Sequence, residues 1–205
     1  KPLWKFDPKV PGERAVHACC DVVNRGVALW GDKVFVGTID GRLIALDRKT
    51  GTQLWATQTV DTTKPYTITG APRVVKDMVL IGNGGAEFGV RGYVTAYDAD
   101  TGKERWRFYT APNPTKAKDG AASDEIFATK ANATWSDKGE WQTSGGGGTV
   151  WDAIVYDKDL DQIYLGVGNG NPWNHGTRSN GEGDNWFLSS IVALDASTGA
   201  YKWHY

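Results

Sequence analysis

The stretch Ala45-Leu46-Asp47-Arg48-Lys49-Thr50-Gly51-Thr52-Gln53-Leu54-Trp55 decides the fold, because the chain repeats its pattern. The same order of Ala-x-Asp, Thr-Gly and Trp returns over 96–106 and over 193–203. Trp4, Trp55 and Trp106 follow one another at intervals of 51 residues, and Trp203 comes 97 residues after Trp106, close to two further periods. Repetition at such a period is typical of solenoids and propellers, so we expect roughly four repeat units.

Each repeat unit predicts a small antiparallel sheet. An apolar, strand-like run precedes each repeat, as at Val34–Val36, Val79–Ile81 and Ile163–Leu165. The Asp-x-x-Thr-Gly segment is typical of a turn, because aspartate accepts hydrogen bonds from backbone amides ahead of it and glycine tolerates positive φ. The tryptophan then falls on the next strand. Several strands per unit fit a blade of a β-propeller, with the tryptophans filling the space between blades.

The composition supports an all-β class and excludes several functions. The chain has 26 glycines, ten tryptophans and eight tyrosines, which favours short strands and tight turns over a helical bundle. A net charge of −1 with interspersed signs gives no electrostatic footprint for nucleic acid. No apolar stretch approaches the ~20 residues of a membrane helix. The start, Lys1–Trp4, resembles neither a signal peptide nor a natural amino terminus.

Motifs of other enzyme classes are missing from the sequence. The histidines lack zinc-ligand spacing, and no Cys-x-x-Cys-His haem attachment site occurs. Neither a Gly-x-Ser-x-Gly nucleophile motif nor a phosphate-binding Gly-Lys-Ser/Thr loop is present. Nicotinamide chemistry, serine hydrolysis and nucleotide hydrolysis therefore have no support.

Two segments depart from the repeat. Residues from about 111 to 148 form a polar insert that ends in four glycines, and within it Ser123–Thr134 predicts a short helix with Ser123 as N-cap. The second segment, Pro172–Asn185, is rich in Asn and Gly and lacks strand alternation. Long loops on a rigid β-scaffold are where binding sites usually lie.

Cys19 and Cys20 are the only cysteines, and they are neighbours. Adjacent Cα atoms lie ~3.8 Å apart, whereas ordinary disulfides prefer ~5.5–6 Å, so a bridge here would close a small ring. Such a ring constrains little chain, and stability does not explain it. The pair is either two reduced, hydrophobic side chains or a rigid sulfur platform beside a ligand.

Three further residues are candidates for ligand binding. Glu87 follows the glycine-rich turn after 79–81, and Asn169 holds a similar place after 163–165. Carboxylate and amide oxygens are ligands that Ca²⁺ accepts, although both residues are also ordinary turn formers. Trp151 lies outside the repeat, so it is a candidate for stacking on a planar ligand, with a core position as the alternative.

The chain resembles the quinoprotein alcohol dehydrogenases, which use pyrroloquinoline quinone (PQQ) and a metal ion. The segments that carry the resemblance run in the family's order: His17–Gly26, Gly84–Tyr97, Gly147–Asp152 and Gly168–Trp173. Asp184–Ser190 is more similar to the quinohaemoprotein branch. The family forms an eight-bladed propeller of four-stranded antiparallel blades. The resemblance thus implies that residues 1–205 are one incomplete propeller domain, an N-terminal-half segment with about four blades.

The resemblance also implies roles for individual residues. Cys19 and Cys20 would form a disulfide against one face of the quinone, and Trp151 would stack on the other. Glu87 and Asn169 would bind the metal, with Ca²⁺ expected and a lanthanide still open. Polar or backbone contacts to the quinone would come from Arg25, Thr69, Gly85, Ala86, Glu87 and Thr149.

The family mechanism transfers hydride from an alcohol to the quinone and passes electrons to a cytochrome c-type acceptor. The resemblance places the catalytic base, an aspartate, beyond Tyr205, so no catalytic residue is expected within the chain and the isolated segment is expected to be inactive. It also leaves room for haem c in a further domain. An oxidised cysteine pair and the family together imply the bacterial periplasm. A non-catalytic propeller scaffold with the same repeat is the alternative, and it leaves the cysteine pair, Glu87, Trp151 and Asn169 unexplained.

Overall fold

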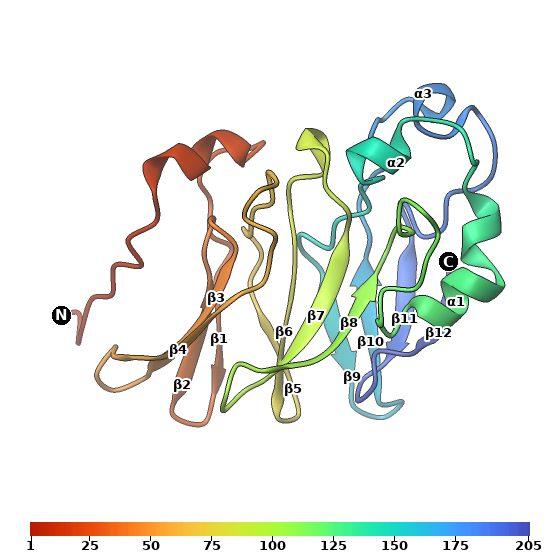
Figure 1. Ribbon diagram of the computed structural model, residues 1–205. Coiled ribbons are helices and arrows are strands. Elements are labelled where there is room, and N and C mark those ends of the chain that lie inside the picture. Colours follow the sequence, from red (N-terminus) through yellow and green to blue (C-terminus); the bar gives the residue numbers. More distant parts are fainter.

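A computed structural model describes residues 1–205, and its strands form three antiparallel sheets of four strands each. Figure 1 shows the sheets side by side in chain order. The predicted all-β class with four-stranded blades is confirmed. The first sheet comprises β1 (Val27–Trp30), β2 (Lys33–Gly37), β3 (Arg42–Asp47) and β4 (Gln53–Gln58). The second comprises β5 (Arg73–Val75), β6 (Met78–Gly82), β7 (Tyr93–Asp98) and β8 (Glu104–Tyr109), and the third β9 (Ile154–Asp157), β10 (Gln162–Gly166), β11 (Ile191–Asp195) and β12 (Tyr201–His204).

The predicted turn of the repeat joins the last two strands of each sheet. In the first sheet, Asp47 Oδ1 accepts hydrogen bonds from the backbone N–H of Thr50 (2.7 Å) and of Lys49 (2.9 Å). Gly51 follows with φ of +72°, a region that glycine enters without steric cost. Asp98 and Asp195 accept the equivalent bonds in the other two sheets. The turn chemistry was thus predictable from three residue types.

The repeat tryptophans link one sheet to the next. A Cβ added to Gly51 would lie 2.6 Å from the Trp4 ring, and one added to Gly102 would lie 2.6 Å from the Trp55 ring. Trp106 covers the equivalent glycine of the third sheet. The last tryptophan, Trp203, is 43% exposed, because this chain supplies no further sheet for it to cover.

The number of complete blades differs from the prediction of about four. Trp4 lies in an extended N-terminal segment that belongs to no strand, and its indole N–H donates to the carbonyl of Arg48 at 2.9 Å. Trp4 therefore covers the turn glycine of the first sheet, as Trp55 and Trp106 cover that of the next sheet, but it does not itself lie in a sheet. The four regularly spaced tryptophans predict roughly four repeat units, but only three complete sheets are present.

The main core lies between the second and third sheets. It gathers 19 buried residues, among them Leu80, Phe108 and Leu165, and a smaller cluster around Phe35 and Ile81 joins the first and second sheets. Strand β6 is buried along its whole length, since the second sheet has a neighbour on both faces. The core thus fixes the angle at which neighbouring sheets present their loops.

The helices lie in the loops between strands, except η1, which precedes β1. The short helices η1 (Gly12–His17), η2 (Ala86–Phe88), α2 (Trp141–Ser144) and α3 (His175–Ser179) lie at one edge of the row of sheets, the upper edge in Figure 1. Helices α1 (Asp124–Thr129) and η3 (Ala131–Thr134) belong to the insert. None of these helices is long and apolar enough to cross a bilayer.

The helix predicted over Ser123–Thr134 is two shorter helices. Ser123 holds the N-cap position, but its side chain makes no capping bond, and its Oγ accepts from the Tyr109 N–H instead. The Asp124 carboxylate accepts the amides of Gly120 (2.8 Å) and Ala121 (3.2 Å). The segment over 172–185 contains no strand, as predicted, although α3 lies within it.

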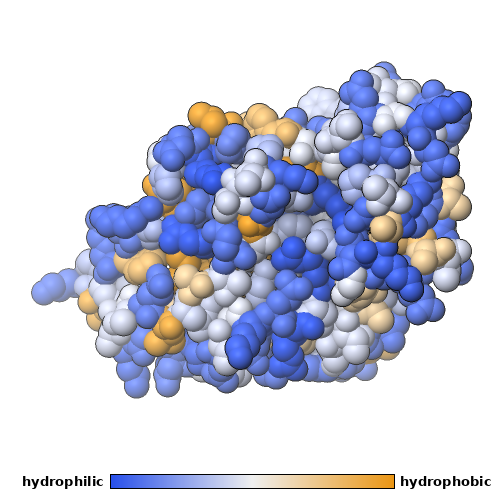
Figure 2. Space-filling model, in the orientation of Figure 1, coloured by the Kyte–Doolittle hydropathy of each residue, from blue (hydrophilic) through white to orange (hydrophobic).

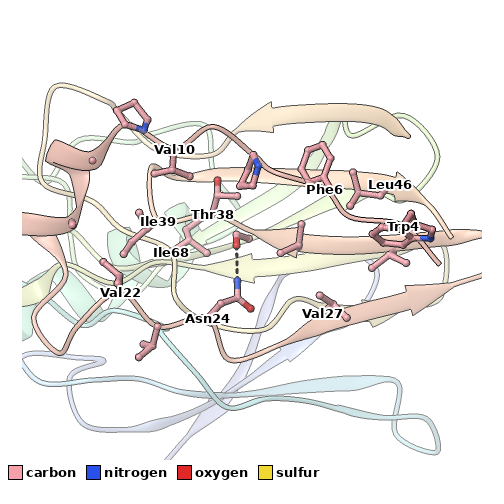
Figure 3. Close-up of a pocket in the computed structure, with 18 residues that line it drawn as sticks. Trp4, Phe6, Val10, Val22, Asn24, Val27, Thr38, Ile39, Leu46 and Ile68 are labelled. Carbon is pink, nitrogen blue, oxygen red and sulfur yellow. Dashed lines mark hydrogen bonds between the residues drawn. The ribbon is translucent and has the colours of Figure 1, made fainter. Parts of the chain in front are cut away.

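A cavity of about 500 Å³ lies against the first sheet and does not contain the candidate site residues. Figure 2 shows apolar residues over the N-terminal side of the molecule. Figure 3 shows the side chains of this cavity, including Trp4, Phe6, Leu46 and Val10. It is the apolar face of the first sheet that no other sheet of this chain covers, which explains its composition.

Candidate functional site

Nine of the ten predicted site residues line a single cavity of about 160 Å³. They come from five separate segments of the chain, and they are Cys19, Cys20, Arg25, Thr69, Gly85, Glu87, Thr149, Trp151 and Asn169. The tenth, Ala86, is 2% exposed and does not line the cavity. Small-molecule sites usually measure ~300–1,000 Å³, so this cavity is smaller than a typical complete binding site.

The cysteine pair follows η1 directly. Cys19 and Cys20 are joined by a disulfide, with their Cα atoms 3.8 Å apart, which confirms the oxidised reading over the reduced one. Both residues are exposed and both line the cavity. Asp21 then takes φ of +76°, a left-handed conformation, and turns the chain into the cavity wall. The bridged pair therefore presents sulfur to the cavity.

Arg25 and Thr69 are joined twice. The Arg25 backbone N–H donates to the Thr69 carbonyl at 2.9 Å, and its Nη1 donates to Thr69 Oγ1 at 2.6 Å. The Arg25 guanidinium also lies over the Trp151 ring, 4.9 Å from its centroid. A cation over an indole face is attracted to it, and the Arg25 guanidinium thus covers one face of the Trp151 ring. A ligand stacking on that face must displace the guanidinium.

Trp151 is 44% exposed, unlike the buried Trp106 of the repeat. Its backbone lies against Gly70, where an added Cβ would come within 2.6 Å of the Trp151 carbonyl oxygen. Thr149, two residues earlier and 2% exposed, accepts the Gly168 N–H at 3.0 Å through its carbonyl. The core alternative for Trp151 is therefore wrong, because its backbone is held while its ring faces the cavity.

Glu87 lies in η2, after a loop that is stabilised by hydrogen bonds of the buried Asn83 side chain. Asn83, fully buried, accepts the Tyr93 N–H at 2.9 Å and donates to the carbonyls of Gly84 and Arg91. Gly85 has φ of +101°, and a Cβ there would lie 2.5 Å from the Pro65 carbonyl oxygen. The Glu87 carboxylate is exposed and makes no hydrogen bond or ion pair within the chain, so its oxygens are free for a ligand.

Asn169 offers an amide oxygen to the same cavity. Its Nδ2 donates to the Gly170 carbonyl at 3.1 Å, which orients the amide and leaves Oδ1 without a partner in the chain. No group of three or more His, Cys, Asp or Glu side chains is close enough to hold a metal ion. One carboxylate and one amide oxygen are hard ligands that suit Ca²⁺, but they fill only part of its coordination of six to eight oxygens.

The glycine run before Thr149 connects the segment that carries Glu87 to the segment that carries Asn169. Gly147 donates its N–H to the Val90 carbonyl at 3.1 Å, and Gly148 donates to the Asn169 carbonyl at 2.9 Å. All four residues over 145–148 have φ between +71° and +81°. A Cβ at Gly147 would lie 2.7 Å from the Asn169 carbonyl oxygen. Only glycine allows this approach, which connects the loop after η2 to Asn169.

The sequence reasoning missed five residues of the cavity: Ala18, Asp21, Val23, Thr67 and Gly84. Thr67, only 3% exposed, bonds to Gly84 through both backbone groups. A signal for Thr67 was available, because residues at i and i+2 of an extended segment share a face and Thr69 was already a candidate. Asp21 had no such signal beyond its place after the cysteines.

All 205 residues match the family described as PQQ: glucose/ethanol/alcohol dehydrogenase, β-propeller domain. Quinohemoprotein alcohol dehydrogenase ADH IIB of Pseudomonas putida is 59% identical over 205 residues, which cover 100% of this chain and 29% of that protein. The solved structure of quinohemoprotein alcohol dehydrogenase ADHIIG from Pseudomonas putida superposes with a TM-score of 0.93 at 56% identity, over 99% of this chain and 29% of the other.

A solved structure described as a europium-containing methanol dehydrogenase superposes with a TM-score of 0.85 at 40% identity, over 99% of this chain and 35% of the other. The chain thus spans about a third or less of the length of these proteins. The family match, by contrast, runs from the first residue to the last. The chain belongs to the PQQ-dependent glucose/ethanol/alcohol dehydrogenase β-propeller family.

Proposed function

We propose that the protein containing this chain oxidises alcohols with PQQ and a metal ion bound at the cavity between Cys19–Cys20 and Trp151. The observation that carries the proposal is the convergence of nine predicted residues from five segments on one cavity. A non-catalytic scaffold requires the repeat tryptophans and turns, but it does not require an exposed disulfide, an exposed indole and a free carboxylate in one place. The family match and the two alcohol dehydrogenase relatives favour the enzyme.

The residues of the cavity fit a flat, anionic ring system. The disulfide and the Trp151 indole offer two apolar, polarisable surfaces, and we assign them to opposite faces of the quinone. Arg25 supplies a cation for the quinone's carboxylates, with Thr69 orienting it at 2.6 Å. Backbone groups of Gly85 and Ala86 and the Thr149 hydroxyl would complete the polar contacts. A ring stacked on the Trp151 face that Arg25 covers would require the guanidinium to move off that face.

Glu87 and Asn169 would hold the metal ion through their free oxygens, and when bound the quinone and metal supply an electrophilic carbon that accepts hydride. Ca²⁺ suits these ligands, and a lanthanide, also a hard cation, suits them equally. No side chain of this chain is assigned to remove the hydroxyl proton. We place that base, an aspartate, beyond Tyr205 in the complete protein. Electrons would pass to a cytochrome c-type acceptor, in the periplasm.

Equilibrium binding of PQQ to the full-length protein in the presence of Ca²⁺ tests the proposal. Trp151→Ala removes one stacking surface and should weaken PQQ binding about tenfold or more. Trp173→Ala is the matched control, because Trp173 is 71% exposed and does not line the cavity. Unchanged affinity in Trp151→Ala, or an equal loss in both variants, would sink the assignment.

A further inference from the structure

A second cavity, of about 440 Å³ and polar, lies beside strands β7 and β8 of the second sheet and shares no residue with the candidate site. Its walls come from the segment after β4, the start of β7, strand β8 and the insert around α2. The volume falls within the ~300–1,000 Å³ of small-molecule sites. Its chemistry is carried by Lys64, Tyr66, Arg91, Tyr93, Arg107 and Tyr109.

The residues that line this cavity carry more positive than negative charge, and two of the cations also pair with carboxylates outside it: Arg91 with Asp119 at 2.8 Å and Arg107 with Glu104 at 3.3 Å. Three cationic side chains face one carboxylate, Asp61, which accepts hydrogen bonds from the Thr63 hydroxyl (2.6 Å) and N–H (2.9 Å). Burial raises the pKa of Tyr66 to about 12 and raises the pKa of Tyr93 as well. These phenols therefore stay neutral and can donate or accept hydrogen bonds without cancelling the cations.

Arg107 reaches the cavity from β8 with part of its donor capacity unused. Its Nε donates to Thr95 Oγ1 at 2.8 Å, and its Nη2 donates to the Thr59 carbonyl at 3.1 Å and to the Tyr97 hydroxyl at 3.3 Å. The side chain is 20% exposed, and its ion-pair partner, Glu104, does not line the cavity. Nη1 makes no hydrogen bond of its own beyond the contact of the guanidinium with the Tyr109 side chain, and it is not sealed from solvent.

Arg91, in the loop just before β7, shows the same pattern. Its Nε donates to the Ala111 carbonyl and its Nη2 to Asp119, both at 2.8 Å, while Nη1 again has no acceptor. The side chain is only 11% exposed. Its guanidinium lies 3.6 Å from the centroid of the Tyr109 ring, and that of Arg107 lies 5.9 Å from the same centroid. One aromatic ring thus holds both cations near each other.

We propose that this cavity binds a small organic anion, with its carboxylate or phosphate group on the free Nη1 atoms of Arg91 and Arg107. A guanidinium with an unused N–H binds such oxyanions through charge-assisted bonds, which are stronger than neutral ones. The Tyr109 ring lies under the Arg91 guanidinium at 3.6 Å and supports it at the cavity wall. This inference goes beyond the proposed function, because the site is separate from the quinone site and needs no turnover.

Calorimetric titration of the full-length protein with benzoate, phenyl phosphate and benzamide tests the site. Benzoate or phenyl phosphate should bind saturably, and benzamide, their neutral counterpart, should bind at least about tenfold more weakly. The ratio of the two anion affinities identifies carboxylate or phosphate as the preferred group. The proposal is overturned if neither anion shows saturable binding up to about 10 mM, or if benzamide binds as tightly as benzoate.

Variants separate this site from general charge effects. Arg107→Gln should lower anion affinity about tenfold or more, since a hydrogen bond to a charged group is worth ~1.5–3 kcal/mol. Arg105→Gln on the same strand is the control, because Arg105 pairs with Asp98 outside the cavity. If Arg107→Gln folds poorly, Thr143→Glu tests the site instead. Thr143 is an exposed residue of the cavity, and the new carboxylate should compete with the anion for the arginines and lower its affinity. Full affinity in Thr143→Glu, or in folded Arg107→Gln, contradicts the proposal.

Discussion

The N–H of Gly148 donates a 2.9 Å hydrogen bond to the carbonyl oxygen of Asn169. Through the same run, Gly147 donates to Val90, shortly after η2, the helix that carries Glu87. The glycine run is therefore a backbone connection between the loops that present the two proposed metal ligands. All four glycines have positive φ angles, so this backbone connection requires glycine at these positions.

Gly147→Ala should destabilise the full-length protein by on the order of 3 kcal/mol, because the methyl would meet the Asn169 carbonyl oxygen at 2.7 Å in addition to the cost of positive φ. Chemical denaturation measures the loss. Gly120→Ala is the matched control, since Gly120 has φ of +77° but nothing within 4 Å of an added Cβ, and it should cost about 1–2 kcal/mol. Equal losses in the two variants would contradict the close approach.

Trp106 tests the docking of one sheet on the next. Trp106→Ala should lower the free energy of unfolding by about 3–5 kcal/mol, because it empties the space over Gly199 in the main core. Trp106→Phe should cost clearly less, since the indole N–H of Trp106 has no hydrogen-bond partner to lose. If denaturation shows the Phe variant to be as unstable as the Ala variant, ring packing is not what the repeat tryptophan contributes.

Asp119 should make stability depend on acid pH. Burial alone would raise its pKa, but hydrogen bonds from Arg91 and Asn113 outweigh burial and hold the pKa below its usual 3.8. A lowered pKa in the folded state means that the stabilisation is present above the unfolded value and is lost as pH falls through the folded value. Asp119→Asn should therefore flatten the fall in stability between about pH 5 and pH 2.

The control for this pH dependence is Asp184→Asn, at an exposed carboxyl that makes no hydrogen bond or ion pair. Urea denaturation across the same pH range should show the parent slope for Asp184→Asn. A parent slope for Asp119→Asn as well would mean that the pair with Arg91 does not stabilise the fold.

Glu87→Gln should weaken Ca²⁺ binding to the PQQ-loaded, full-length protein by at least about tenfold, because an amide replaces the only carboxylate of the proposed ligand pair. Competition with a fluorescent chelator measures the affinity. Glu13→Gln, at an exposed carboxylate of η1 outside the cavity, should bind Ca²⁺ like the parent. A Glu87→Gln variant with parent affinity would remove Glu87 from the metal site.

The repeat made most of the fold predictable. Asp47, Thr50 and Gly51 specify a turn through local hydrogen bonds and one positive φ, so three residues suffice to place it. The count of sheets was less predictable, because Trp4 marks a docking position without showing whether strands surround it. Ser123 failed as a helix cap because the backbone N–H of Tyr109, fourteen residues away, binds its hydroxyl instead.

The two cavities differ in how far the sequence predicts them. The candidate site was found because its residues lie in short, family-like segments such as Gly84–Tyr97. The anion cavity was missed because Lys64, Arg91, Arg107 and Thr143 come from segments that only the stacking of sheets brings together. No local pattern marks an arginine whose Nη1 is left without a partner, since that depends on contacts distant in the sequence.

The most direct measurement is a crystal structure of the full-length protein with PQQ and Ca²⁺. The account predicts the quinone between the Cys19–Cys20 disulfide and the Trp151 ring, with Arg25 moved off that ring and Ca²⁺ bound to Glu87 and Asn169. A quinone bound elsewhere, or a cation without Glu87 among its ligands, would contradict it.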